Sequence, residues 1–274
     1  MLSSRCKRLI WCFVALVTVA SPLGGIIAAT KPGETPGRRE TTAPQGLSDL
    51  EPHFRRSVLR GWRVFQTSHA RDGVACVHCH PDHDQIRQWA AAYPKVEVFD
   101  GTPYRVKSLA EVVGEAWRKH ADQPPEDRID DLVAYIAWWG DGTRITPGHS
   151  RRLPPPDKDL RLLKAAVAEG RKHYQRNDCG QCHQTGIRDR GSSSITVGKT
   201  AAGFPRFVPR ADQVLDMGSY LQIHMRERGA ETVSDPDRSV VELSAYLHSL
   251  AAGQTLQPGR NHQRREAGST RSIE

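Results

Sequence analysis

A five-residue motif occurs twice in the chain and constrains its fold more than any other feature. It reads Cys76-Val77-His78-Cys79-His80 in the first half and Cys179-Gly180-Gln181-Cys182-His183 in the second. Each copy places two thiols one helical turn apart and a histidine directly after the second thiol, which is the pattern of covalent haem attachment. The sequence therefore predicts two covalently bound haem c groups. Their expected thioether residues and proximal iron ligands are Cys76, Cys79 and His80 for the first haem, and Cys179, Cys182 and His183 for the second.

Two other kinds of site also use C-x-x-C pairs. A zinc knuckle would take four ligands from the two pairs and leave both adjoining histidines unexplained. A thioredoxin-type redox pair normally follows a strand and needs no histidine after its second cysteine. Covalent haem accounts for all three positions in both copies, so we favour it over either alternative.

The remaining cysteines leave little room for other thiol chemistry. Six cysteines are present, and the two outside the motifs, Cys6 and Cys12, lie in the N-terminal apolar segment. Once that segment is removed, no thiol is left for a structural disulfide or a catalytic nucleophile. Hydrophobic residues make up only 38% of the chain, as expected if two buried porphyrins supply much of the core.

Residues 1–29 have the pattern of a secretory signal peptide. A charged stretch that ends at Arg8 precedes an apolar run from Leu9 to Ala20, and small residues follow at Ala28-Ala29. We expect cleavage near Thr30 and a periplasmic protein, because haem c is attached on the far side of the bacterial inner membrane. An uncleaved segment would instead anchor the chain, and contact with a membrane is expected only in that case.

The chain after the signal segment is expected to be all-α. Apolar residues recur at helical spacing, as at Phe54, Val58, Trp62 and Phe65, and no strand-like alternation is evident. The second half repeats the first. Cys179 lies 103 residues after Cys76, His224 lies 104 after His120, and Tyr246 lies 111 after Tyr135. The offset drifts only where loops intervene, which is typical of a duplicated domain.

The order of these features resembles class I cytochromes c. In each half an aromatic-containing helix precedes the C-x-x-C-H motif, and a terminal helix carries Leu-x-x-Tyr-Ile or Leu-x-x-Tyr-Leu. The resemblance implies two tandem cytochrome c-like domains, each wrapped round one covalently attached haem. The expected divisions are a signal peptide at 1–29, a disordered linker at 30–50, a first cytochrome c domain at 51–142, a Pro-rich linker at 143–158, a second cytochrome c domain at 159–252 and a basic disordered tail at 253–274.

A finer resemblance links the chain to diheme thiosulfate dehydrogenases and to the diheme subunit of the Sox thiosulfate-oxidising complex. It rests on the Tyr93-Pro94 and Phe204-Pro205 stretches, each followed by a ligand-bearing helix and then by the Leu-x-x-Tyr helix. In those families a cysteine on the penultimate helix ligates the active-site iron and takes part in sulfur chemistry. This chain has no cysteine there, and the same region is occupied by Ala116 and His120 in the first half and by His224 and Met225 in the second.

The sixth ligand of the first iron is predicted to be His120. No methionine lies between Cys76 and Pro156, so the usual histidine–methionine pair is excluded for this haem. His120 shares the apolar face of its helix with Leu109, Val113 and Trp117, where a histidine needs a partner. The alternatives are His83, Lys119 or an open site.

The sixth ligand of the second iron is predicted to be His224, which the 104-residue offset pairs with His120. Met225 is the alternative, since it shares a helix face with Leu221, and Met217 is expected to be a packing residue. The remaining histidines outside the motifs are expected at surface or loop positions: His53, His69, His149, His173, His248 and His262.

Two functions fit these features. We favour a diheme electron-transfer protein that connects a dehydrogenase or donor protein with a respiratory acceptor, because no spare nucleophile, general base pair or second cofactor motif is evident. The alternative is a haem-dependent oxidoreductase of an inorganic sulfur compound such as thiosulfate, implied by the family resemblance alone. Redox proteins are the expected partners, and acidic ones would suit the formal charge of +8. Nucleic acid is not expected, since the basic residues form no stripe with interleaved aromatics.

Overall fold

The computed structural model describes residues 44, 46–69, 73–97, 104–121, 128–148, 157–183, 197–229 and 236–260, all of which belong to one compact unit. The predicted signal peptide, most of the predicted linker at 30–50 and residues 261–274 lie outside this part. Among the described helices, none combines the length and the apolar character needed to cross a membrane.

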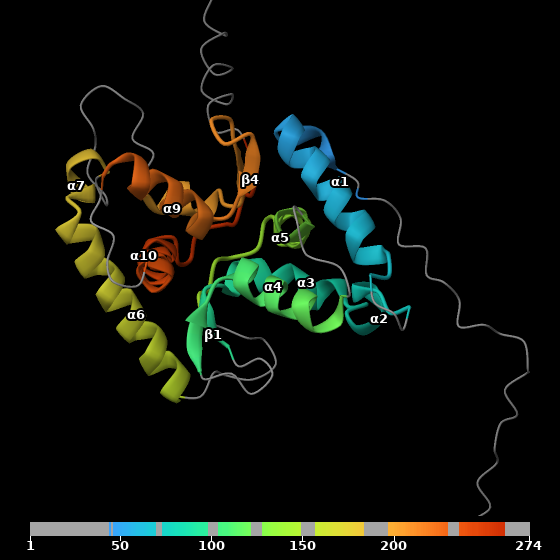
Figure 1. The fold of residues 1–274 in the computed structure, drawn as a ribbon, viewed down its shortest axis with the longest axis horizontal. Helices are drawn as coiled ribbons and strands as arrows, with labels where there is room; N and C mark the ends of the chain where they lie inside the picture. The colour runs from blue at the N-terminus through green and yellow to red at the C-terminus, as the bar shows by residue number, and fades with distance from the viewer. Residues whose placement is uncertain are drawn as a thin grey trace, which may run out of the picture. The chain divides into compact units, whose positions relative to one another are not determined.

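Apart from the short η1 at the start of the first half, the two halves of the described chain have the same order of elements (Figure 1). The first half comprises η1 (Leu47–Asp49), α1 (Pro52–Gln66), α2 (Cys76–Cys79), α3 (His83–Ala92), β1 (Lys95–Glu97), β2 (Arg105–Lys107), α4 (Leu109–His120) and α5 (Arg128–Trp139). The second comprises α6 (Asp157–Arg176), α7 (Cys179–Cys182), α8 (Val197–Ala202), β3 (Arg206–Val208), β4 (Gln213–Leu215), α9 (Met217–Glu227) and α10 (Pro236–Leu250). The mostly helical fold is confirmed.

Side chains at the helix starts explain several of these boundaries. The Glu51 carboxylate accepts hydrogen bonds from the backbone N–H groups of His53 and Phe54 at the start of α1. Ser108 and Glu111 form a reciprocal capping box at the start of α4. Asp216 accepts from the backbone N–H of Ser219 at the start of α9. Each cap satisfies N–H groups that have no partner within the helix.

Two short hairpins were not expected from the sequence. β1 pairs with β2, with Lys95 opposite Lys107, and β3 pairs with β4, with Arg206 opposite Leu215. Each strand has three residues, which is too short to show a period of two in the sequence. Each hairpin ends directly before a helix N-cap, so it fixes where α4 and α9 begin.

The first and last helices of each half pack closely at a glycine. A Cβ on Gly61 of α1 would lie 1.9 Å from the carbonyl oxygen of Asp131 on α5. A Cβ on Gly170 of α6 would lie 2.0 Å from the carbonyl oxygen of Glu242 on α10. Only glycine permits this approach of two helix backbones, and it occurs at matching places in the two halves.

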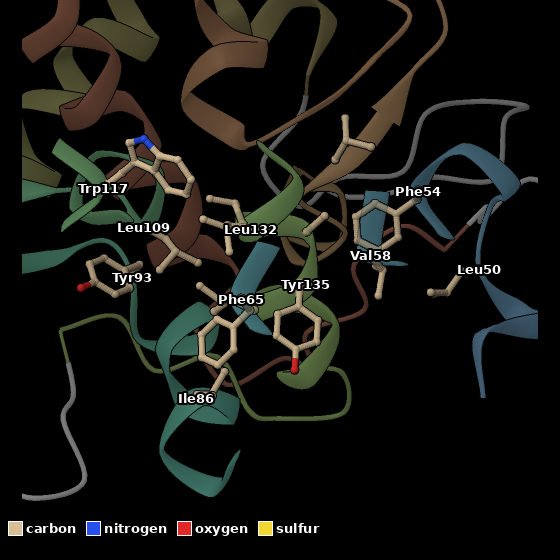
Figure 2. Close-up of a cluster of buried hydrophobic side chains, with 14 residues drawn as sticks. Leu50, Phe54, Val58, Phe65, Ile86, Tyr93, Leu109, Trp117, Leu132 and Tyr135 are labelled. Atoms are coloured by element: carbon tan, nitrogen blue, oxygen red, sulfur yellow. The ribbon is translucent and has the colours of Figure 1, made fainter. Parts of the chain in front are cut away.

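Two main hydrophobic cores correspond to the two halves. The first draws side chains from α1, α3, α4 and α5, with Phe54, Ile86 and Tyr135 almost fully buried (Figure 2). The second draws on α8, α9 and α10, and includes Ala201, Met217 and Leu243. Met217 is 4% exposed, in agreement with its expected packing role.

The predicted domain limits differ from the structure at two places. Ile145, inside the predicted 143–158 linker, is 1% exposed and belongs to the second core. Leu256, inside the predicted 253–274 tail, is 3% exposed, and its backbone N–H bonds the carbonyl of Thr143. Arg144 and Thr255 form an isolated antiparallel β-bridge between the two segments. Proline indicated a linker in the first segment and polar, basic composition indicated disorder in the second, but long-range backbone pairing orders residues 143–148 and 253–260.

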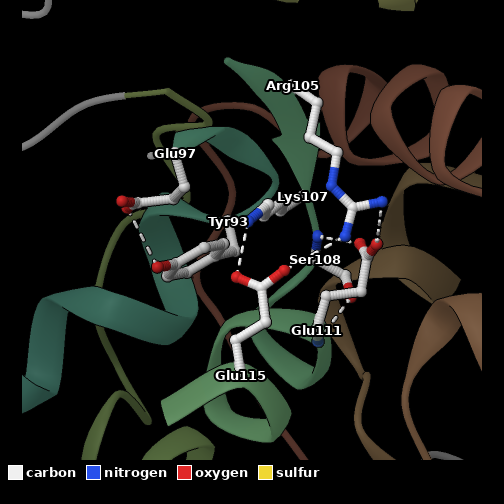
Figure 3. Close-up of polar contacts among 7 residues, drawn as sticks. All are labelled: Tyr93, Glu97, Arg105, Lys107, Ser108, Glu111 and Glu115. Carbon is white, nitrogen blue, oxygen red and sulfur yellow. Dashed lines mark hydrogen bonds and ion pairs between the residues drawn. The ribbon is translucent and has the colours of Figure 1, made fainter. Parts of the chain in front are cut away.

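A network of charged side chains surrounds the first hairpin (Figure 3). The Lys107 ammonium is fully buried and lies 2.5 Å from a carboxylate oxygen of Glu115 on α4. Arg105 donates to the other oxygen of Glu115 at 3.1 Å. Burial by itself would raise the pKa of Glu115, but the hydrogen bonds and charges of Lys107 and Arg105 outweigh it and lower that pKa. The carboxylate is therefore ionised wherever this pair is intact.

Replacing Glu115 with Gln should destabilise the protein by about 3 kcal/mol at neutral pH, because it leaves the Lys107 charge buried and unpaired. A carboxyl whose pKa is lower in the folded protein than in the unfolded chain stabilises the folded protein at pH values above its unfolded pKa. This stabilisation is lost as the pH falls to the folded-state pKa. The difference in the free energy of unfolding between wild type and Glu115→Gln, measured with urea, should therefore become smaller below about pH 4.5.

The exposed pair Glu169–Lys172 supplies the matched control. Solvent screens this pair, so Glu169→Gln should change the unfolding midpoint little at any pH. An equal effect of the two variants would show that burial of Lys107 contributes nothing.

Candidate functional site

The first motif forms a single helical turn, α2, with a cysteine at each end. The backbone N–H of His80 bonds the carbonyl of Cys76 at 2.9 Å and closes the turn. Cys76 is half-buried, whereas Cys79 and His80 are exposed. His78 turns back, and its Nδ1 accepts from the backbone N–H of Ala75 at 2.8 Å. The turn thus directs His80, and not His78, away from the backbone.

The second motif repeats this geometry in α7. The backbone N–H of His183 bonds the carbonyl of Cys179 at 2.8 Å. Cys179 is half-buried and Cys182 is exposed, as in the first motif. Asp178 precedes the turn in the left-handed conformation, with φ of 50°, and Tyr174 on α6 donates its hydroxyl to the carbonyl of His183. Both motifs therefore present two thiols and one imidazole from one turn of helix.

All four motif thiols are free, and none is in a disulfide. Burial raises the pKa of the Cys76 and Cys179 thiols above the usual value for cysteine. Each motif follows a helix, α1 or α6, and not a strand. These features fit thioether attachment better than a redox-active pair.

The described residues contain no group of three or more histidine, cysteine or carboxylate side chains arranged to hold a metal ion. A structural zinc site needs four such ligands. A haem c needs only two thioether positions and the axial ligands, since the porphyrin supplies the other four nitrogens.

The second motif has a histidine facing its own. The ring centroids of His183 and His224 on α9 lie 5.8 Å apart. With metal–nitrogen bonds of about 2 Å, two imidazoles that share one ion have their centres roughly 6 Å apart. His224 therefore lies at the separation expected of the second axial ligand.

The surroundings of His224 keep it neutral. Burial, followed by the charges of His183 and Arg210, lowers the pKa of His224. Its Nδ1 is buried and has no hydrogen-bond partner, and Tyr220 stacks on the ring with centroids 5.6 Å apart. A neutral imidazole is the form that binds iron. Met225, the alternative ligand, is partly buried against the second core.

In the described part of the first motif, the ring in contact with the motif histidine is a tryptophan and not a second histidine. The ring centroid of His80 lies 4.9 Å from that of Trp89 on α3, in an edge-on arrangement. Burial, followed by the charge of His120, lowers the pKa of His80, so His120 lies in its neighbourhood. His120 is the last residue of α4 and is exposed.

The 104-residue pairing of His120 with His224 is wrong in structural terms. The N-caps of α4 and α9 are Ser108 and Asp216, which are 108 residues apart. On that register the counterpart of His224 is Ala116, and His120 lies one helical turn beyond it. The sequence offset missed this because the loop before each helix differs in length between the halves.

Several other histidines are not at the surface positions expected of them. His173 on α6 is 4% exposed and lies 3.0 Å from a carboxylate oxygen of Glu242. His248 bonds the carbonyl of Ser244 within α10, and burial lowers its pKa. His53 stacks on Phe207 at 4.0 Å. His149 and His262 lie outside the described residues. The surroundings of His69 and His83 concern the first motif and are described below.

Several side-chain nitrogens in the first half are buried without hydrogen-bond partners, and two of their residues, Trp62 and Trp139, share a hydrophobic cluster with Cys76. Such groups are rare in folded proteins, so several together indicate a missing acceptor. A porphyrin carries two carboxylates that could accept from them, which fits haem at this site. The nitrogens belong to Trp62, Gln66, His69, His83 and Trp139.

No known protein family and no curated protein sequence matches the chain. The fold itself is cytochrome c-like. A chain in the crystal structure of SoxXA from P. pantotrophus has a similar fold, with a TM-score of 0.56 over 75% of this chain and 77% of that chain. The two sequences are 16% identical, so the likeness shows the fold alone.

Proposed function

We propose that the chain is a periplasmic diheme c-type cytochrome that transfers electrons between a donor protein and a respiratory acceptor. The observation that carries the proposal is the repeated turn, α2 and α7, which presents two thiols and a histidine in each half. Haem c, when bound, supplies an iron that exchanges one electron at a time. The cytochrome c-like fold supports the proposal.

The chain's own residues have defined roles in this proposal. Cys76, Cys79, Cys179 and Cys182 would hold the two porphyrins through thioether bonds. His80 and His183 would bind the irons from the proximal side, and His224 would bind the second iron from the distal side. The apolar side chains that pack beside Cys76 and Cys179 would shield part of each attached group from water, which would lower the reorganisation that accompanies a change of iron charge.

The alternative is a haem-dependent oxidoreductase of an inorganic sulfur compound such as thiosulfate. The described α4 and α9 contain no cysteine, although the penultimate helix of the resembling sulfur-oxidising families supplies one. Electron transfer therefore has the stronger support.

The test uses the full chain produced in a host that attaches haem c. We expect haem to stay with the chain in denaturing electrophoresis, and the reduced protein to be oxidised rapidly by an acceptor cytochrome. Thiosulfate should not reduce the oxidised protein. Loss of all haem under denaturing conditions would overturn the proposal, and reduction by thiosulfate would favour the alternative.

A further inference from the structure

We propose that the first haem has an open sixth position that takes a small exogenous ligand, whereas His224 closes this position at the second. The inference rests on the proposed function, because it concerns residues that face the haem irons. It assigns different tasks to the two halves, although their motifs and element order are the same.

The register of the two penultimate helices carries the inference. Lys107 ends β2 and Leu215 ends β4, and each is followed directly by the N-cap of a helix. The Ser108 side chain accepts from the backbone N–H three residues on, and Asp216 does the same. The helices therefore start in the same way from equivalent hairpins, so residues can be compared by their place in the helix.

Place in the helix separates the two candidate histidines. His224 is the eighth residue of α9, and the eighth residue of α4 is Ala116. Alanine has no atom that can bind iron. His120 is the twelfth residue of α4, and four residues along a helix correspond to about 6 Å. His120 therefore lies one full turn beyond the position in α4 that corresponds to His224 in α9, where the ring of His224 faces that of His183.

His69 and His83 each have a buried Nε2 without a hydrogen-bond partner, but both rings are held by other aromatic contacts. The ring of His83 stacks on Trp139 at 4.3 Å. The ring of His69 packs on Trp117 at 4.9 Å, and its Nδ1 lies 3.2 Å from the Arg128 guanidinium. Trp117 is itself 5% exposed and is part of the first core.

The charge near this position favours an anion. The last turn of α4 follows Ala116 and carries three exposed basic residues and no acidic one: Arg118, Lys119 and His120. Positive charge at the edge of a site raises the local concentration of small anions. We therefore expect small anions such as azide to bind the ferric first haem, and carbon monoxide to bind the ferrous one.

Carbon monoxide titration of the reduced protein tests the inference, after measurement of haem per chain. We expect wild type to bind one carbon monoxide per two haems, His224→Ala to bind two, and His120→Ala to bind one, as wild type does. In the ferric wild-type protein, azide should change the spectrum of one haem and leave the other unchanged.

Two results would overturn the inference. One is a wild-type protein that binds no carbon monoxide, because the sixth position of the first haem would then be occupied, and binding by His120→Ala, His69→Ala or His83→Ala would identify the ligand. The other is binding of two carbon monoxide molecules by wild type, because neither site would then be closed. A chain with no haem at all would instead contradict the proposed function, so the two failures are distinguishable.

Discussion

The double variant Cys76→Ala/Cys79→Ala should retain one covalently bound haem per chain, where wild type retains two. The two thiols are the ends of one helical turn, and neither is engaged in a disulfide. No other described cysteine lies in the first half that could take their place. Haem content after denaturing electrophoresis and acid-acetone extraction, measured per mole of chain, is the readout.

The second motif provides the matched control. Cys179→Ala/Cys182→Ala should also leave one haem, and the quadruple variant should leave none. The two double variants should differ in spectrum, because on the proposed ligation only the second haem has His224 opposite its proximal ligand. Retention of two haems by either double variant would contradict attachment through these thiols. Stoichiometric zinc in place of haem would restore the zinc knuckle as the better interpretation.

The attachment turns could be predicted from the sequence because they depend on local spacing alone. Two cysteines three residues apart necessarily lie about one helical turn apart, and the histidine follows directly. The long helices were equally accessible, since α1, α5, α6 and α10 each carry an apolar face of several turns. The structure adds that α2 and α7 are single turns and not parts of longer helices.

The hairpins and the ordered segments at 143–148 and 253–260 could not be predicted, because they depend on contacts between distant residues. Ile145 donates its backbone N–H to the carbonyl of Gln254, and Gly259 donates to the carbonyl of Pro205. A short polar segment gains order only from such partners, and its own composition indicates a loop.

The distal iron ligands were only partly predictable from the sequence. His224 was predicted from its offset of 104 residues to His120, and the structure brings it next to His183. The pairing of His120 with His224 failed because a constant sequence offset assumes loops of equal length. The 15 residues between α2 and β1 at 80–94 become 23 between α7 and β3 at 183–205, whereas the seven between β1 and β2 at 98–104 become four between β3 and β4 at 209–212. A loop difference of this size shifts the offset without changing the spacing that makes either helix amphipathic.

His224→Ala should convert the second haem from low spin to high spin in the ferric protein and leave the first haem unchanged. His224 lies with its ring 5.8 Å from that of His183, and its Nδ1 has no other partner. Removal therefore takes away the sixth ligand without breaking a hydrogen bond of the ring. Low-temperature EPR, integrated over the two haems, should show the low-spin signal of the second haem replaced by a high-spin signal.

Met225→Leu is the matched control, since it changes the neighbouring residue and conserves its volume. Met225 is partly buried against the second core, so leucine should leave the EPR spectrum as it is in wild type. His224→Met should give a second, independent readout. A thioether ligand favours the ferrous state, and it should raise the potential of one haem by on the order of 0.1 V.

The opposite pattern would identify a different ligand. If Met225→Leu produces high-spin iron and His224→Ala does not, the methionine binds the second iron. The close approach of His224 to His183 would then reflect packing alone, and the second haem would have the higher potential typical of histidine–methionine ligation. If neither variant changes the spectrum, α9 supplies no ligand. No residue of α9 would then occupy the sixth position of the second iron, and this conclusion would not depend on what the first haem binds.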